Sequence, residues 1–215
     1  MIKIAPSILA ADFTKLGEDI KSVSSADYLH FDVMDGMFVN NISFGIPVLK
    51  SVRKVTDMIL DVHLMIETPS RYIKEFAEAG ADIITFHVEA EKPENIHTTI
   101  NEIHMLGKKA GLSVKPQTPA KRILPYINLL DLVLVMTVEP GYGGQEFISS
   151  MLTKIKELRN VIDGSGVNCE LEVDGGINPE TARQCVEAGS NVLVAGIDVF
   201  NATDRAAHIE KLRNP

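Results

Sequence analysis

Short apolar runs alternate with longer amphipathic stretches along the whole chain, and we count eight rounds of this pattern. The short runs are rich in valine, isoleucine and leucine, which is typical of buried strands, whereas the longer stretches carry apolar residues at the spacing of helices. Strands are predicted at residues 2–7, 28–34, 58–64, 83–88, 109–114, 132–137, 168–173 and 191–195. The clearest helical patterns lie at residues 15–23, 69–79, 93–106, 151–161, 179–188 and 204–212.

Strict alternation of strands and helices predicts parallel strands joined by right-handed crossovers, in either an open doubly wound sheet or a closed barrel. Eight units in 215 residues, about 27 residues each, favour the closed (β/α)8 or TIM barrel. Polar residues gather at the ends of the strands, where barrel active sites lie. They are Ser7, His30, Asp32, His63, His87, Thr137 and Asp174. No linker or low-complexity tract divides the chain, so residues 1–215 are predicted to form a single α/β barrel domain.

Four of these polar residues have the side chains of a metal site. His30 and Asp32 are two residues apart on one predicted strand and therefore point to the same face. His63 and Asp174 lie at the ends of two other strands, and inward side chains at one end of a barrel converge on its axis. Two histidines and two carboxylates can bind Zn²⁺, with Fe²⁺, Mn²⁺ or Co²⁺ as alternatives. The competing explanation, core histidines and turn aspartates, requires four separate coincidences at one barrel mouth.

Asp32 and Asp174 are also placed as an acid and a base. They lie on the second and seventh predicted strands, so they are expected to face each other across the barrel mouth. Such a pair suits removal of a proton from one face of a carbon and return of a proton to the other. A bound cation would keep both carboxylates charged and stabilise an enediolate formed from a carbonyl substrate. Methionines at three strand ends are expected to keep water away, namely Met34, Met65 and Met136.

Glycines after the last three predicted strands indicate a phosphate site. The segment 139–145, Glu-Pro-Gly-Tyr-Gly-Gly-Gln, follows the sixth strand and precedes a helix. Its backbone N–H groups can turn inward as an anion-binding nest, and the helix start is expected to add partial positive charge. Gly175 and Gly176 follow the seventh strand and Gly196 follows the eighth, where barrels commonly bind phosphate. A tight turn without a ligand explains any one of these sites but not their joint occurrence.

The net charge of −8 limits how an anionic substrate can bind. Lysine and arginine nowhere run together, which argues against a nucleic-acid partner or an anionic membrane. A phosphate must therefore be bound locally, and backbone amides can do this without a basic patch. Cys169 and Cys185 lack metal or disulfide spacing, and the first residues lack a signal-peptide or membrane-spanning pattern. We expect a cytoplasmic protein.

Runs of sequence that cover almost the whole chain closely resemble those of ribulose-phosphate 3-epimerases. The runs are residues 5–13, 30–39, 61–65, 111–118, 135–148, 172–178 and 194–200. The resemblance implies a barrel of the ribulose-phosphate-binding type. It also implies that the protein interconverts D-ribulose 5-phosphate and D-xylulose 5-phosphate, in the pentose phosphate pathway, by moving the proton at C3. We expect one divalent metal per chain, with zinc as the favoured ion. We also expect a homo-oligomer, whose number of subunits the sequence leaves open.

The resemblance also implies roles for particular residues. The metal ligands are implied to be His30, Asp32, His63 and Asp174, with Asp32 and Asp174 also serving as proton acceptor and donor. Ser7 and His63 are implied to contact the substrate. The phosphate is implied to lie on the backbone amides of Gly141, Tyr142, Gly143, Gly144, Gly175, Gly176, Gly196 and Ile197.

The chain departs from the family pattern at two positions. Asn40 stands where the family usually has a proline before asparagine, which should only loosen a loop. Ile197 stands where the family usually has a serine, which removes a hydroxyl near the phosphate but leaves the backbone N–H. The departure at Ile197 affects the expected affinity for phosphate and the choice of sugar phosphate as substrate.

Four other functions can be weighed against the sequence. An epimerase of a six-carbon phosphoketose, such as D-allulose 6-phosphate, would keep the metal and both acids and differ only in the pocket. Decarboxylases of related barrels need an Asp-x-Lys-x-x-Asp run, and the segment from Asp32 to Asp35 has no lysine. Lys115, at the end of the fifth strand, leaves open the Schiff-base chemistry of an aldolase. A non-catalytic scaffold has no need of two facing acids beside a metal.

Overall fold

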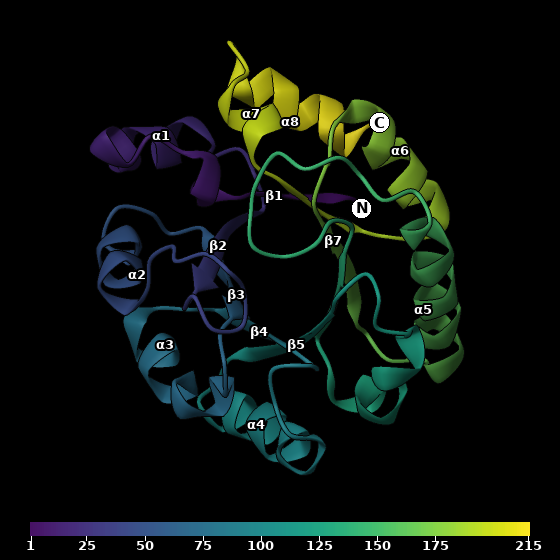
Figure 1. Cartoon of the computed structure of the whole chain (residues 1–215). Helices are drawn as coiled ribbons and strands as arrows, with labels where there is room; N and C mark the ends of the chain where they lie inside the picture. Colours follow the sequence, from purple (N-terminus) through teal and green to yellow (C-terminus); the bar gives the residue numbers. More distant parts are fainter.

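A sheet of eight parallel strands forms the centre of the molecule, and Figure 1 shows it surrounded by helices. The computed structural model describes all 215 residues. The strands are β1 (Lys3–Pro6), β2 (Tyr28–Met34), β3 (Ile59–Met65), β4 (Ile83–His87), β5 (Lys109–Val114), β6 (Leu132–Met136), β7 (Glu170–Asp174) and β8 (Val192–Ala195). Their spatial order is β1-β8-β7-β6-β5-β4-β3-β2. A parallel bridge between Ser7 and His30 joins the two edge strands, so the sheet is a nearly closed barrel.

The helices lie outside the strands. They are α1 (Leu16–Ser22), α2 (Ile46–Arg53), α3 (Ile73–Ala79), α4 (Pro93–Met105), α5 (Met151–Ser165), α6 (Pro179–Ala188), α7 (Ile197–Phe200) and α8 (Arg205–Arg213). Helices α2 and α7 lie outside the helical patterns that are clearest in the sequence. None of the helices has the length and apolarity needed to cross a lipid bilayer.

The fifth unit departs from the regular pattern, because β5 is followed by two 3₁₀ helices and no α-helix. These helices are Ala120–Arg122 and Leu124–Leu129. Pro119 and Pro125 lie at the start of each, and proline lacks the N–H that an α-helix needs beyond its first turn. The outer layer is therefore thinner at this point, and Tyr126 and Ile127 cover the core in place of a longer helix.

Alternate residues of each strand face two different cores. Val133 and Val135 of β6 belong to a cluster of 51 buried residues between the strands and the helices. Leu132 and Leu134 belong to a second cluster of nine residues, which fills the inside of the barrel. Because both faces of the strands are buried, the strands appear in the sequence as continuous apolar runs. The interior cluster supports the polar residues at the barrel mouth from below.

The predicted strands match the structure closely. Residues 28–34 and 109–114 form strands with the predicted ends, and the other strand ends differ by at most two residues. The prediction was short for α5, which continues from 161 to Ser165. An ion pair of 2.6 Å between Arg159 and Asp163, one turn apart, supports this extra turn, and Gly166 ends it in the left-handed region at φ 70°.

Candidate active site

The four predicted metal ligands lie together at the mouth of the barrel. His30 and Asp32 come from β2, His63 from β3 and Asp174 from the end of β7. Asp32 and His63 are partners in the register of β2 and β3. Asp32 Oδ1 is 3.3 Å from His30 Nε2 and from His63 Nδ1, and Asp174 Oδ2 is 3.9 and 3.8 Å from the same nitrogens. One ligand atom from each residue lies within 4.8 Å of the other three.

This donor set fits a divalent cation. Bonds of about 2.1 Å to a tetrahedral ion place neighbouring ligand atoms about 3.4 Å apart, close to the separations between these side chains. His30 Nε2 is buried and has no hydrogen-bond partner within the protein, which is costly for a ring nitrogen unless an ion or another donor or acceptor meets it. Two imidazoles with two carboxylates suit Zn²⁺ and similar transition metals better than Ca²⁺ or Mg²⁺.

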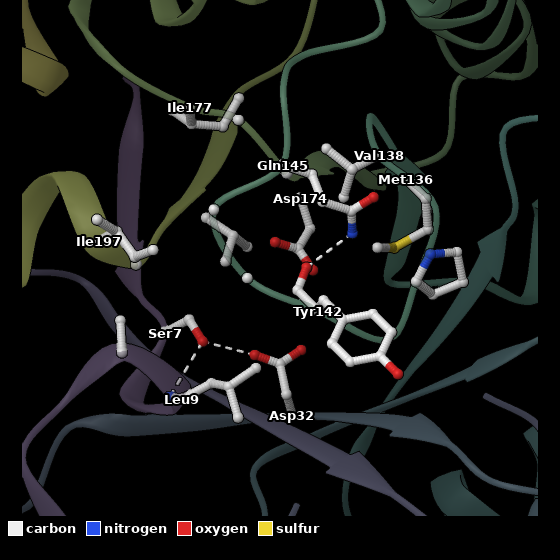
Figure 2. A pocket seen from close by; sticks show the side chains of 18 of the residues that line it. Ser7, Leu9, Asp32, Met136, Val138, Tyr142, Gln145, Asp174, Ile177 and Ile197 are labelled. Carbon is white, nitrogen blue, oxygen red and sulfur yellow. Dashed lines mark hydrogen bonds between the residues drawn. The ribbon is translucent and has the colours of Figure 1, made fainter. Parts of the chain in front are cut away.

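A pocket of about 590 Å³ opens at this cluster, within the size range of small-molecule sites. Asp32 and Asp174 both line it, and Figure 2 shows their carboxylates pointing toward each other. The hydroxyl of Ser7 donates a hydrogen bond of 2.5 Å to Asp32 Oδ2. His30 and His63 are fully buried and are not among the lining residues. The acids therefore face the pocket, and the histidines lie behind them.

The predicted methionines surround the two acids. Met34, Met65 and Met136 line the pocket and are almost completely buried. Met136 pairs with Asp174 in the register of β6 and β7, so its thioether lies beside that carboxylate. The walls nearest the acids are therefore apolar.

The glycine segments line the same pocket as the two acids. The lining there includes Gly141, Tyr142, Gly143, Gly144, Gly175, Gly176, Gly196 and Ile197. Gly141, Gly144, Gly175 and Gly176 have positive φ angles, which turn the backbone in ways that other residues rarely adopt. The structure thus brings the two acids and all the predicted phosphate-binding positions to one cavity.

The expectation that a helix start adds charge to the segment 139–145 is wrong for α5. This helix begins only at Met151, which does not line the pocket. The N–H of Ile148 donates to the carbonyl of Thr137 at 2.9 Å, so the chain first returns to the end of β6 before it can start a helix. Backbone amides of the glycine segment itself remain available to an anion.

Comparison with known proteins identifies the family. A sequence model described as the ribulose-phosphate 3 epimerase family matches residues 3–200. The chain belongs to the ribulose-phosphate 3-epimerase family. It is 52% identical over 216 residues to "Ribulose-phosphate 3-epimerase" of Bacillus subtilis, with 99% of each chain covered. It is 48% identical to the chloroplastic ribulose-5-phosphate-3-epimerase of Arabidopsis thaliana, covering 99% of this chain and 76% of that protein.

Solved structures of other proteins share the barrel of this epimerase family member. A 3-hexulose-6-phosphate synthase from Salmonella typhimurium superposes with a TM-score of 0.75 at 16% identity, covering 99% of this chain and 97% of that one. A 3-keto-L-gulonate-6-phosphate decarboxylase from Vibrio cholerae gives a TM-score of 0.74 at 16% identity, with the same shares of the two chains covered, 99% and 97%. At this level of identity the likeness concerns the fold alone.

The two departures from the epimerase pattern lie in different surroundings. Asn40 contributes its backbone carbonyl, which accepts a hydrogen bond from the Tyr142 hydroxyl. The neighbouring Asn41 donates from Nδ2 to the carbonyl of Gly141 at 2.7 Å. These bonds join the loop after β2 to the glycine loop, and a proline at position 40 would keep the carbonyl. Ile197 is the first residue of α7 and is half-exposed beside the pocket.

Burial and charge push the proton affinities of the two acids apart. Burial acts to raise the pKa of Asp32, but the neighbouring His30 and His63 outweigh it and lower the pKa well below its usual range. Burial and the charge of Asp32 raise the pKa of Asp174 to about 6. Burial opposes a charge on His30, yet the carboxylates of Asp32 and Asp61 together raise the pKa of its imidazole.

The structure also reveals buried groups behind the ligands to which the sequence reasoning gave no role. Asp61 Oδ2 is 2.6 Å from Nδ1 of His30, and Glu172 Oε1 is 3.9 Å from the same nitrogen. Asp61 precedes the metal ligand His63 by two residues, and Glu172 precedes the metal ligand Asp174 by two. The two-residue period of a strand therefore places Asp61 on the same face as His63, and Glu172 on the same face as Asp174. Burial and the nearby Asp61 raise the pKa of Glu172. The two-residue spacing is the signal that could have found them.

His87 and Glu89 form a second group of this kind. Burial lowers the pKa of His87 to about 4, so its ring is neutral at pH 7. Burial acts to raise the pKa of Glu89, but hydrogen bonds from His87 and from the backbone of Lys115 contribute to lowering it to about 2. In the sequence, His87 is a polar residue at a strand end, and no motif there assigns it a function.

Proposed function

We propose that this protein is a metal-dependent 3-epimerase that interconverts D-ribulose 5-phosphate and D-xylulose 5-phosphate by moving the proton at C3. The observation that carries the proposal is the pair of carboxylates, Asp32 and Asp174, facing each other in a pocket that is also lined by glycines. Inversion at one carbon needs proton transfer on two faces, and two opposed acids supply this without movement of the substrate. Membership of the epimerase family supports the same reaction.

The pocket accounts for both ends of a phosphoketose. We propose that the phosphate lies on the backbone N–H groups of Gly141–Gly144, Gly175, Gly176, Gly196 and Ile197, which need no basic side chain. This placement puts the sugar carbons between the two acids, with the Ser7 hydroxyl beside them. The apolar methionines then exclude water from the carbon that loses its proton.

The two acids have different proton affinities, which suits one of them to accept a proton and the other to donate one. Asp32, with its lowered pKa, is a carboxylate at neutral pH and can accept the C3 proton on one face. Without a cation, burial and the charge of Asp32 raise the pKa of Asp174 to about 6, so Asp174 takes up a proton more readily than Asp32 and is placed to return one on the opposite face. The reverse reaction uses the same residues in exchanged roles.

His30, Asp32, His63 and Asp174 would hold the metal, and their fit rests on the distances and the buried, unpartnered His30 Nε2 described above. We propose zinc, while iron, manganese and cobalt accept the same donors. When bound, the cation would supply positive charge that stabilises the enediolate formed by loss of the C3 proton.

Exchange of the two acids for their amides tests this function. We expect Asp32→Asn and Asp174→Asn each to lower the turnover of D-ribulose 5-phosphate at saturating zinc by roughly 10²–10⁴-fold. Asp57→Asn is the matched control, because Asp57 is exposed. Product formed in D₂O should carry deuterium at C3 from the first turnover. Extensive transfer of the original hydrogen into product would contradict the two-base mechanism.

Metal content and substrate choice complete the test. We expect about one zinc per chain after dialysis against the metal, and a large loss of this zinc in His63→Ala. Full occupancy in that variant would exclude His63 as a ligand. D-ribulose 5-phosphate should turn over faster than D-allulose 6-phosphate, and the opposite order would identify a six-carbon epimerase.

We propose further that the protein forms a homo-oligomer in the cytoplasm. Two large apolar side chains of the loop after β2, Met37 and Ile42, are 70% and 75% exposed, and both line a groove with Phe44 and Tyr72. Exposed apolar patches of this kind are typical of protein contacts. Both cysteines are free and buried, which is compatible with a reducing compartment. A monomer in sedimentation equilibrium would contradict the proposed assembly.

A further inference from the structure

A chain of three hydrogen-bonding groups leads away from the outer nitrogen of His63. His63 Nε2 is 2.9 Å from Nε2 of His87, and the two ring planes are inclined by 30° with their centroids 5.0 Å apart. His87 Nδ1 is 3.2 Å from Glu89 Oε2. Glu89 Oε1 in turn accepts a hydrogen bond of 2.9 Å from the backbone N–H of Lys115. Both imidazoles are fully buried and the Glu89 side chain is 20% exposed, so no solvent competes for the contact between the two rings.

Hydrogen counting along this chain determines which nitrogen of each ring carries a proton. The Glu89 carboxylate can only accept, so His87 Nδ1 must be the donor. A neutral imidazole has one N–H, which leaves His87 Nε2 as an acceptor. The hydrogen between the two rings therefore belongs to His63 Nε2. A neutral His63 protonated at Nε2 has its lone pair on Nδ1, the atom that lies 3.3 Å from Asp32 Oδ1 in the metal cluster.

Packing keeps the middle ring in this orientation. His87 lies between two aromatic neighbours, with the His63 ring at 5.0 Å and the Phe38 ring at 4.8 Å between centroids. The Nζ of Lys115 lies 3.8 Å from the centroid of the Phe38 ring. Rotation of His87 would break both of its hydrogen bonds inside a closed core, where an unpaired polar atom is costly.

We propose that His87 and Glu89 are positioning residues, which act through His63 by selecting the tautomer whose Nδ1 lone pair faces the divalent cation. This inference rests on the proposed metal site and deepens it. The other histidine ligand needs no relay, because Asp61 reaches His30 Nδ1 directly at 2.6 Å. Partners of this type orient metal-binding histidines, and their loss typically weakens metal binding about 10–100-fold.

Glu89→Gln gives the sharpest test, because it changes the hydrogen pattern while keeping the shape. The amide oxygen of the new side chain is expected to accept from the Lys115 N–H, as Glu89 Oε1 does, which leaves its NH₂ group facing His87. His87 Nδ1 must then accept and its Nε2 must donate to His63. His63 would consequently carry its hydrogen on Nδ1, where the metal must bind. Glu89→Ala removes the carboxylate but imposes no tautomer.

We expect zinc affinity to fall roughly 10–100-fold in Glu89→Gln and less in Glu89→Ala. The full-length protein, freed of metal, is titrated with zinc in competition with a chelating dye, and thermal unfolding of each variant checks its fold. Glu187→Gln is the matched control, because Glu187 is exposed on α6. If Glu89→Gln bound zinc as tightly as the control, or as tightly as Glu89→Ala, the relay would be refuted.

Imidazole NMR gives a second readout, and its measurement on the unaltered protein does not depend on any variant folding. The chain has six histidines, and nitrogen shifts of ¹⁵N-labelled rings distinguish the two tautomers. In the zinc-loaded protein, His87 should be protonated at Nδ1 and His63 at Nε2, and the metal-free Glu89→Gln variant should show the reverse pattern. Protonation of His87 at Nε2 in the unaltered protein would overturn the proposal. Failure of the unaltered protein to bind zinc would instead refute the metal site itself.

Discussion

Gly176→Ala tests whether the glycine backbone shapes the substrate pocket. Gly176 has φ +67°, and a left-handed conformation costs an L-residue about 1–2 kcal/mol. A Cβ atom there would also lie 2.7 Å from the backbone nitrogen and 2.8 Å from the Cα of Phe147. Because backbone cannot rotate away, the overpacking should cost about 1–3 kcal/mol more. Together the two effects amount to a loss of about 2–5 kcal/mol.

Gly166→Ala separates the two contributions. Gly166 has φ +70°, and no atom lies within 4 Å of the Cβ position, so only the backbone cost of about 1–2 kcal/mol applies. One kcal/mol shifts the Tm of a chain of this size by about 2–4 °C. We therefore expect a fall of about 2–8 °C for Gly166→Ala and of about 4–20 °C for Gly176→Ala in thermal unfolding followed by circular dichroism.

The two variants should also differ in KM for the substrate. Phe147 and Gly176 both line the pocket, so a shift of Phe147 moves the glycine segments apart, whereas Gly166 ends α5 and does not line the pocket. Loss of one backbone bond to a phosphate, at about 1.5–3 kcal/mol, raises KM by about 10–100-fold. We expect this rise in Gly176→Ala with kcat little changed. Equal KM values in the two variants would refute the assignment of this segment to the phosphate.

Three further predictions concern other parts of the molecule. Ile197→Ser should lower KM for the phosphoketose by up to about tenfold without changing kcat, because a hydroxyl near the phosphate strengthens ground-state and transition-state binding alike. An unchanged KM would mean that the backbone N–H suffices. Tyr142→Phe removes the hydrogen bond to the Asn40 carbonyl and should raise KM about 2–10-fold, with faster proteolysis of the two joined loops. Burial raises the pKa of Cys169 and Cys185 to about 12, so a disulfide reagent at pH 8 should label neither thiol until urea unfolds the chain; rapid labelling would contradict their burial.

The local pattern of the sequence was enough to predict the barrel and to select the four proposed metal ligands. Apolar runs of strand length indicate strands that are buried on both faces of a parallel sheet. The ends of the eight strands could therefore be predicted to within two residues. The two-residue period of a strand put His30 and Asp32 on one face, and the convergence of strand ends in a barrel brought in His63 and Asp174. These inferences use only the chain's own periodicity and the general geometry of barrels.

Other features depended on how distant segments pack. The return of the chain to Thr137 before α5 and the hydrogen bond between Tyr142 and Asn40 involve residues whose partners lie elsewhere in the fold. The contact of His63 with His87, and of His87 with Glu89, likewise requires the measured positions of two rings and a carboxylate from neighbouring strand ends. Hydrogen bonds act over about 3 Å. Strand period predicts which face a side chain occupies, but only the packed tertiary structure brings a particular donor within that distance of its acceptor.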